Sequence, residues 1–194
     1  MSKLKKIKID KTAIKKAMPR AIPRVLPLGA LFLPLGTISI NFLIEKVTRY
    51  NIVELVKAPF SESNELFATL LKSESMAAAR IWLVVAVAGL ALAVLAVLAG
   101  LALCWSGRIK LYAASAAVYA AGTLGAAGMG YGFAKFGTAL AGALMNIATT
   151  SLNIGLYVLG LLLLANAVMC FVQWRSAKEK ARLAALAAKK RKKK

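Results

Sequence analysis

The residues of this chain that could do chemistry are few and widely separated. The sequence contains no histidine, so it lacks the usual proton shuttle and the imidazole metal ligand. Its two cysteines, Cys104 and Cys170, are too far apart in sequence to form a recognisable metal-ligand spacing. We predict that both are structural thiols packed against helices or lipid, with acylation as the alternative. The sequence therefore indicates no metal site and no cofactor.

Carboxylates are also sparse, at 7 Asp+Glu against 27 Lys+Arg, for a net charge of +20. A pair of acid and base carboxylates could come only from Glu62, Glu65 and Glu74, which we expect to balance nearby lysines instead. No Asp or Glu lies in the long apolar stretches, where it would mark a proton relay or a cation site. We therefore expect neither an enzyme nor a proton-coupled transporter.

The elements that must position these residues are long and apolar. Apolar types make up 60% of the chain and the mean hydropathy is +0.69, which is outside the range of soluble domains. A helix of about 20 apolar residues crosses the ~30 Å hydrocarbon core of a bilayer. The pattern predicts an all-α, polytopic membrane protein with four transmembrane helices. These helices are predicted over residues 25–44, 80–106, 111–130 and 154–174.

The basic residues predict how the helices are oriented. Lys and Arg gather in the N-terminal arm 1–24, the turn 107–110 and the tail 175–194, whereas 45–79 is balanced by acids and 131–153 holds only Lys135. Because cytoplasmic loops collect Lys and Arg, both termini are expected inside, in a bacterial cytoplasmic membrane. The other two segments then lie outside, the second at the surface or re-entrant. The first span is predicted to be a retained signal anchor, with a cleaved leader as the alternative.

Both basic ends are predicted to meet an anionic inner leaflet. The arm 1–24 is either a helix lying on that leaflet or a flexible basic arm. The tail 175–194 is expected to prolong the last helix and to bind anionic lipid. Nucleic acid or a ribosome is not the expected partner, because basic runs at the inside ends of spans ordinarily set topology. The lipid contacts are predicted at Lys189, Lys190, Arg191, Lys192, Lys193 and Lys194.

Small residues recur at every fourth position of 111–130, which lets helix backbones approach closely. The motif LPLG occurs twice, seven residues apart, so its prolines and glycines would share one helical stripe. Asn41 and Asn166 are predicted to be interhelical hydrogen-bond donors. Whether the small-residue seams serve the protein's own bundle or another protein is left open. The predicted packing or partner interface comprises Ala114, Ala117, Ala121, Gly122, Gly125, Ala126, Gly130, Pro27, Gly29, Pro34, Gly36 and Asn166.

The segment 45–79 is too long for a plain turn and is predicted to contain an amphipathic helix. Its apolar face would cap the bundle, rest on the outer leaflet or dock a partner. The residues of this predicted docking face are Leu66, Phe67, Leu70 and Leu71.

Two functions fit these features. The first is a non-catalytic accessory, scaffold or assembly subunit of a larger membrane complex, associated with other membrane subunits or with itself. The alternative is a small homo-oligomeric channel or transporter, with the 111–130 span near its axis.

Overall fold

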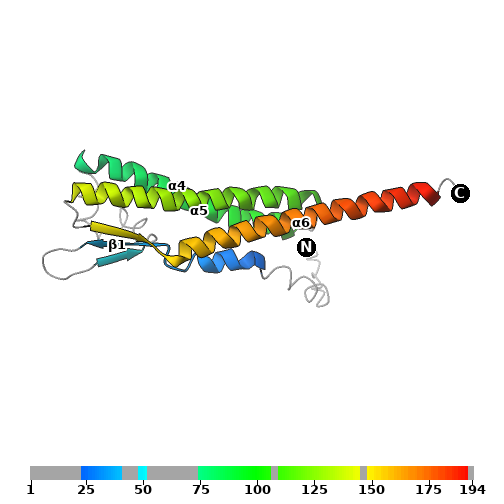
Figure 1. Cartoon of the computed structure of the whole chain (residues 1–194), viewed down its shortest axis with the longest axis horizontal. Helices are drawn as coiled ribbons and strands as arrows, with labels where there is room; N and C mark the ends of the chain where they lie inside the picture. The colour runs from blue at the N-terminus through cyan, green and yellow to red at the C-terminus, as the bar shows by residue number, and fades with distance from the viewer. Residues whose placement is uncertain (1–22, 41–47, 52–73, 106–108, 145–147, 192–194) are drawn as a thin grey trace, which may run out of the picture.

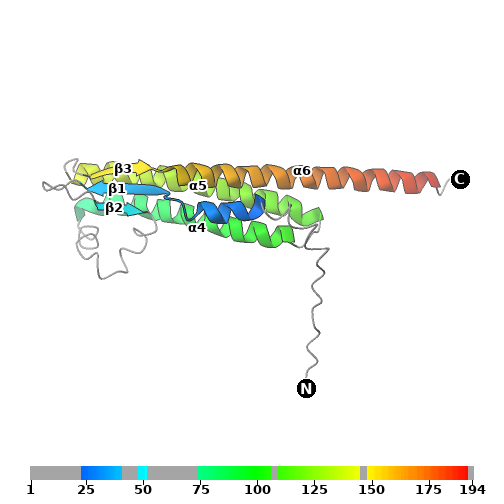
Figure 2. The same cartoon turned by 90° about the horizontal axis from the view of Figure 1, so that it is seen from below.

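The computed structural model describes residues 23–40, 48–51, 74–105, 109–144 and 148–191. This part of the chain is mostly helical, as predicted. Three long helices lie side by side, and a small sheet covers one end of them (Figures 1 and 2). The helices are α4 (Ala77–Trp105), α5 (Ile109–Ala143) and α6 (Ile154–Arg191). A 3-10 turn, η3 (Glu74–Met76), precedes α4, and residues 23–30 form a short helical segment.

Helices α4 and α5 form an antiparallel hairpin whose backbones nearly touch. A Cβ atom at Gly89 would lie 2.5 Å from the Met129 nitrogen, and one at Gly132 would lie 2.7 Å from the Ala86 nitrogen. At Gly125 it would lie 2.8 Å from the Gly89 carbonyl oxygen. These distances leave no room for a side chain, so the glycines are what permits the close approach. Gly125, one of the small residues predicted as a packing seam within 111–130, thus faces α4 inside the protein.

Helix α6 packs on another side of α5, and its first half is closest to it. A Cβ atom at Gly130 would lie 2.9 Å from Leu156 Cδ2, and one at Gly122 would lie 3.3 Å from Leu163 Cδ2. Large side chains then fill the space between the three helices. The largest fully buried ones include Tyr119, Met129, Phe133, Phe136, Leu140, Leu159 and Leu163.

The sheet has three antiparallel strands in the order β2-β1-β3: β1 is Gly36–Ile40, β2 is Thr48–Asn51 and β3 is Ala148–Leu152. Ile38 of β1 pairs with Tyr50 of β2 and with Thr150 of β3. The side chain of Thr150 occupies the space above Gly137 of α5, so β3 lies directly on this helix. The sheet therefore joins two segments that are more than a hundred residues apart in sequence.

The predicted helix over 25–44 is wrong in its second half. The helical residues end at 30, a turn follows, and Gly36–Ile40 form a strand. Pro34 has no backbone N–H and disfavours helix at the residue before it, while the β-branched residues in GTISI suit a strand. The two LPLG motifs consequently do not form one helical stripe, because Pro34 and Gly36 lie beyond the end of the helix. An all-α chain was expected, and the sheet is the departure from it.

The predicted boundaries of the other three helices agree with the structure to different degrees. Helix α4 begins three residues before the predicted span 80–106 and α6 begins at the predicted residue, Ile154. Helix α5 continues to Ala143, beyond the predicted end at residue 130, so the first half of the predicted outer segment 131–153 is helical and its end is β3. Two helical stretches, Glu74–Cys104 and Ile154–Ala187, are long and apolar enough to cross a membrane.

Several predictions lie outside the described residues. They concern the arm 1–22, Asn41 and the apolar face of 45–79, namely Leu66, Phe67, Leu70 and Leu71. The same holds for the six predicted lipid contacts: the backbone of α6 is described as far as Arg191, whereas the side chains of Lys189, Lys190 and Arg191 and the whole of Lys192, Lys193 and Lys194 are not.

Two alanine substitutions on α5 test the close contact with α4. We expect Gly125→Ala to lower the free energy of unfolding by about 1–3 kcal/mol, because its Cβ would meet the backbone of Gly89 and Ala93. Gly128, one turn away, has open space at its Cβ position, so Gly128→Ala should stabilise by up to about 1 kcal/mol through helix propensity. Unfolding by SDS in mild detergent, followed by circular dichroism, measures both. Equal effects of the two substitutions would contradict the packing.

Candidate functional site

A cluster of buried polar side chains lies at the end of the helices away from the sheet. Among the described residues, the buried polar or charged ones are Arg24, Ser115 and Asn166, with exposed fractions of 8%, 0% and 1%. Both cysteines are buried next to them, at 4% for Cys104 and 1% for Cys170. These groups come from four separate segments, so only the fold brings them together. We treat this polar cluster as the candidate site.

The centre of the cluster is a contact between three long helices. Ser115 on α5 donates a hydrogen bond to the Gly100 carbonyl oxygen of α4, at 3.1 Å. Its Oγ is also 3.0 Å from Cys104 Sγ of α4 and 3.6 Å from Cys170 Sγ of α6. Because the single hydroxyl proton is directed to Gly100, the Ser115 oxygen is free to accept from a thiol. The two Sγ atoms are 3.4 Å apart.

The second part of the cluster attaches the N-terminal helical segment to the bundle. Asn166 Nδ2 donates to the Pro23 carbonyl oxygen at 3.0 Å and to the Leu162 carbonyl oxygen of its own helix at 2.8 Å. Arg24 donates from Nη2 to Gln173 Oε1 at 2.7 Å. Its Cζ lies 5.6 Å from the centre of the Tyr112 ring of α5. The prediction that Asn166 is an interhelical donor is confirmed.

Among the described residues, the buried guanidinium of Arg24 contacts neutral groups and no carboxylate. The ion pair found among the described residues joins Arg175 to Glu179, at the exposed end of α6. Arg24 instead faces an amide oxygen and the negative face of an aromatic ring, and a cation over a ring gains roughly 0.5–2 kcal/mol, more as it is desolvated. The guanidinium at the end of the helices is thus held by neutral groups from two helices.

Two polar atoms in this region have no hydrogen-bond partner among the described residues. They are the hydroxyl oxygen of Tyr119 and Oδ1 of Asn166, both fully enclosed. The ring of Tyr119 lies against Gly100, where a Cβ atom would come within 2.5 Å of Tyr119 Cζ. A glycine at position 100 is therefore required for Tyr119 to enter the bundle, one turn along α5 from Ser115.

The chemistry available to this arrangement is limited to two thiols, hydroxyls, amides and one guanidinium. Within the described residues, no three His, Cys, Asp or Glu side chains gather at one place. Both thiols are enclosed by side chains, so the geometry suits a tie between helices better than a reactive centre. Each of the four segments meets at least one other through a polar contact.

The predicted interface residues divide into inside and outside positions. Gly122, Gly125, Ala126 and Gly130 of α5 are buried in contacts within the protein. Ala121 is half-buried, whereas Ala114 and Ala117 are exposed. In the N-terminal part, Pro27 and Gly36 are buried, and Gly29 and Pro34 are exposed. A partner helix could thus reach Ala114 and Ala117 but not the glycines of the seam.

Sequence reasoning missed the polar cluster. It predicted both cysteines to be structural thiols but did not bring them together, and it counted Arg24 only among the basic residues of the arm 1–24. The available signal was that Arg24 directly precedes an uncharged run and that Ser115 is a single hydroxyl among alanines. Neither feature indicates which side chain on another helix it meets.

Comparison with protein-family models, with curated proteins and with solved structures finds no match to this chain.

Oxidation tests the proximity of the two thiols. Copper phenanthroline with oxygen takes two electrons and two protons from neighbouring thiols, and we expect it to join Cys104 to Cys170 within one chain, because their Sγ atoms are 3.4 Å apart. The product should run as a monomer, expose no thiol to maleimide after denaturation, and recover both thiols with a reductant. Cys104→Ser and Cys170→Ser each keep one reactive thiol as controls. Cross-linked dimers, or two thiols still reactive, would contradict the arrangement.

Proposed function

We propose that the chain is a multi-pass membrane protein with four crossings that acts as a non-catalytic accessory, scaffold or assembly subunit of a larger membrane complex. The observation that carries the membrane part is an uncharged, apolar exterior lying between two levels of aromatic side chains. The subunit part is supported by the basic end of α6, which extends beyond the other helices without packing on them.

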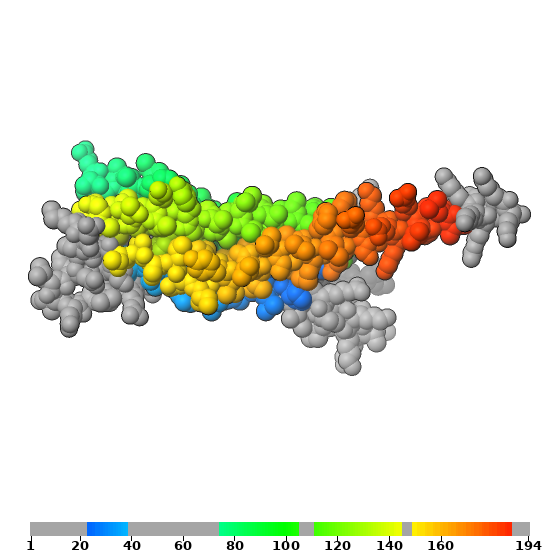
Figure 3. All heavy atoms as spheres, viewed as in Figure 1, coloured from blue at the N-terminus to red at the C-terminus, as the bar shows by residue number. Residues whose placement is uncertain are grey.

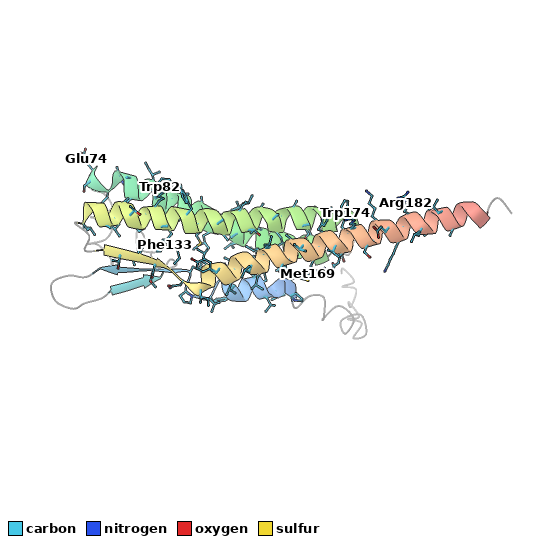
Figure 4. All side chains as sticks on the ribbon, in the orientation of Figure 1. Glu74, Trp82, Phe133, Met169, Trp174 and Arg182 are labelled. Atoms are coloured by element: carbon cyan, nitrogen blue, oxygen red, sulfur yellow. The ribbon has the colours of Figure 1, made fainter. Side chains whose placement is uncertain are left out.

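The aromatic side chains have the spacing of the two faces of a bilayer. At the sheet end, Trp82 of α4 meets Tyr131 of α5 edge to face, with ring centres 5.7 Å apart. Tyr112 lies at the opposite end of α5, about 29 Å from Tyr131 at 1.5 Å per residue. On α6, Tyr157 and Trp174 are separated by about 26 Å in the same way. Figure 4 shows Trp82 and Trp174 in opposite halves of the molecule.

The surface between these levels suits lipid. Large apolar side chains project outward from both α4 and α6, in numbers that water would not favour. They include Val84, Leu92, Leu95 and Leu98 on α4 and Leu161, Leu164, Val168 and Val172 on α6. The sequence contains no charged residue between Trp82 and Trp105, between Tyr112 and Tyr131, or between Tyr157 and Trp174. Aromatic belts around an apolar band are typical of membrane proteins.

The first crossing is the least regular of the four proposed. Pro23 and Arg24 contact Asn166 and Gln173 of α6, while at the other end the Asn153 nitrogen donates to the Leu35 carbonyl oxygen at 3.2 Å. Residues 23–35 therefore run beside α6 for about 30 Å, by the helical rise. The turn after residue 30 keeps its backbone hydrogen bonds through the nitrogens of residues 31–33, as a segment at membrane depth requires.

Four crossings would place both termini on the same side of the membrane, which we propose is the cytoplasm of a bacterial cell. The end of α4 and the start of α5 are on that side too, and the sheet is outside. The basic ends then face the anionic inner leaflet, where each Lys or Arg gains on the order of 1 kcal/mol.

The end of α6 supports a binding role. Residues 175–187 are almost entirely exposed and project past the other helices (Figure 3). Leu183 and Leu186 are 65% and 51% exposed on this projection, among cations. Leucines left exposed on a stretch of helix that packs on nothing else in the described chain favour contact with a membrane surface or with another subunit. The filled interior of the three long helices does not favour a pore within one chain.

Reporter fusions test the proposed topology. We expect green fluorescent protein to fluoresce at either terminus, and alkaline phosphatase to be active when inserted between α5 and β3 but inactive at either terminus. The physical reason is that an even number of crossings returns the chain to the side on which it began, so both basic ends lie in the cytoplasm. Active phosphatase at one terminus would contradict the four-crossing arrangement.

Gentle extraction from native membranes tests the subunit role. We expect the protein to co-purify with unlike membrane proteins in defined ratio, and the double variant Leu183→Ser/Leu186→Ser to lose them because its exposed apolar contacts are removed. Ala184→Ser, on another face of the same exposed helix, is the matched control and should keep them. If the pure protein alone carries ion or solute flux in liposomes and no partner is retained, the channel alternative replaces this proposal.

A further inference from the structure

A groove of about 460 Å³ lies on the outside of the molecule between α5 and α6. One wall is a row of alanines on α5, namely Ala113, Ala116, Ala117 and Ala120, and the other carries Phe171 and Trp174 of α6. The groove exists because alanine side chains end at Cβ while the two aromatic rings project beyond them. Those rings lean on each other, with centres 5.6 Å apart.

A cation stands at the end of this groove. Lys178 follows Trp174 by one turn of α6, and its Nζ lies 5.3 Å from the centre of the Trp174 ring. Arg175 is engaged with Glu179 at 4.0 Å, whereas Lys178 has no carboxylate partner among the described residues. The apolar groove thus leads to the ammonium group of Lys178, which lies over the ring of Trp174 at the level where α6 leaves the apolar band.

We propose that this groove binds one anionic phospholipid of the inner leaflet, with an acyl chain along the alanine row and the phosphate at Lys178. The inference rests on the proposed membrane orientation, which puts the groove in the inner half of the bilayer. The row from Ala120 to Ala113 is about 10 Å long by the helical rise, so it holds the part of the chain nearest the headgroup. Basic pockets between membrane helices on the cytoplasmic side suit such headgroups.

The charge and shape of the site favour lipid over a protein partner. The groove is open to the surroundings and is walled by alanine methyl groups and two aromatic rings, to which a flexible acyl chain conforms more readily than a helix with its own side chains. Its charged end is a lone ammonium, which pairs with a phosphate as a point charge. A second copy of this chain would bring another Lys178 or the basic tail to the same place, and like charges would repel.

Trp174 is itself the probe for the test. In a variant with Trp82→Phe and Trp105→Phe, the remaining fluorescence reports on the groove. The protein is reconstituted in phosphatidylcholine vesicles that contain increasing fractions of phosphatidylglycerol brominated near the carboxyl end of its chain. We expect quenching at a roughly five-fold lower fraction of this lipid than of brominated phosphatidylcholine.

Two pairs of variants separate a site from general attraction to the basic tail. Ala117→Phe fills the groove and should abolish the preference, whereas Ala114→Phe, exposed on the same helix but outside the groove, should keep it. Lys178→Gln should remove most of the roughly five-fold preference, and Lys180→Gln should keep it. Equal effects within either pair, or equal quenching by the two brominated lipids, would overturn the proposal.

Two further outcomes are distinguishable from these. If neither brominated lipid quenches Trp174, the membrane orientation itself fails, and the proposed function fails with it. If Ala117→Phe instead converts a dimer to a monomer, as measured by cross-linking in the same vesicles, a second copy occupies the groove and the lipid proposal is overturned.

Discussion

The contact between α4 and α5 is the constraint on which the rest of the structure depends. Gly89, Gly125 and Gly132 bring the two backbones so close that an added Cβ atom would collide with backbone atoms of the other helix. In the proposed membrane setting, burial from water offers no driving force between helices, so extended contact at short range has to provide the association. Once this hairpin is formed, its outer surface determines where α6 and the sheet can pack.

The segment 23–35 is attached beside α6 by polar contacts as well as by packing. The chain from residue 23 to residue 35 is short and partly non-helical, and its Ala30 and Leu35 side chains are buried in the core. Arg24, Asn166 and the strand pairing of Gly36–Ile40 hold it at both ends. In the proposed membrane setting these contacts also satisfy groups that lipid could not. Attachment of this segment therefore combines buried apolar side chains with hydrogen bonds at both of its ends.

The small residues of α5 serve different purposes on its different faces. Glycines face α4 and α6 and permit close packing within the protein, while exposed alanines leave a trough beside the aromatic rings of α6. One helix thus builds the interior and also shapes an outer surface to which lipid can conform. The extension of α6 adds charge at the end of that surface. This division of faces connects the packing of the bundle with the proposed lipid contact.

The sequence by itself determined the long apolar helices, the small-residue seam and the sorting of charge to the two ends. Those features follow from composition and from the 3.6-residue period, which are local properties. The start of α6 at Ile154 and the donor role of Asn166 were predicted in this way, although the partner of Asn166 was not. Even the end of the first helix at residue 30 could have been argued locally, from Pro34 and the strand-forming residues that follow it.

Only the tertiary structure decided the pairings between distant segments. The strand Gly36–Ile40 pairs with Ala148–Leu152, and Cys104 lies next to both Cys170 and Ser115. Both pairings depend on the lengths of the helices that lie between these residues in the chain. A seam of small residues indicates that another helix can pack closely there, but it does not identify which helix that is. That choice depends on the rotation of each helix about its own axis, which is set by the packing of all the helices together.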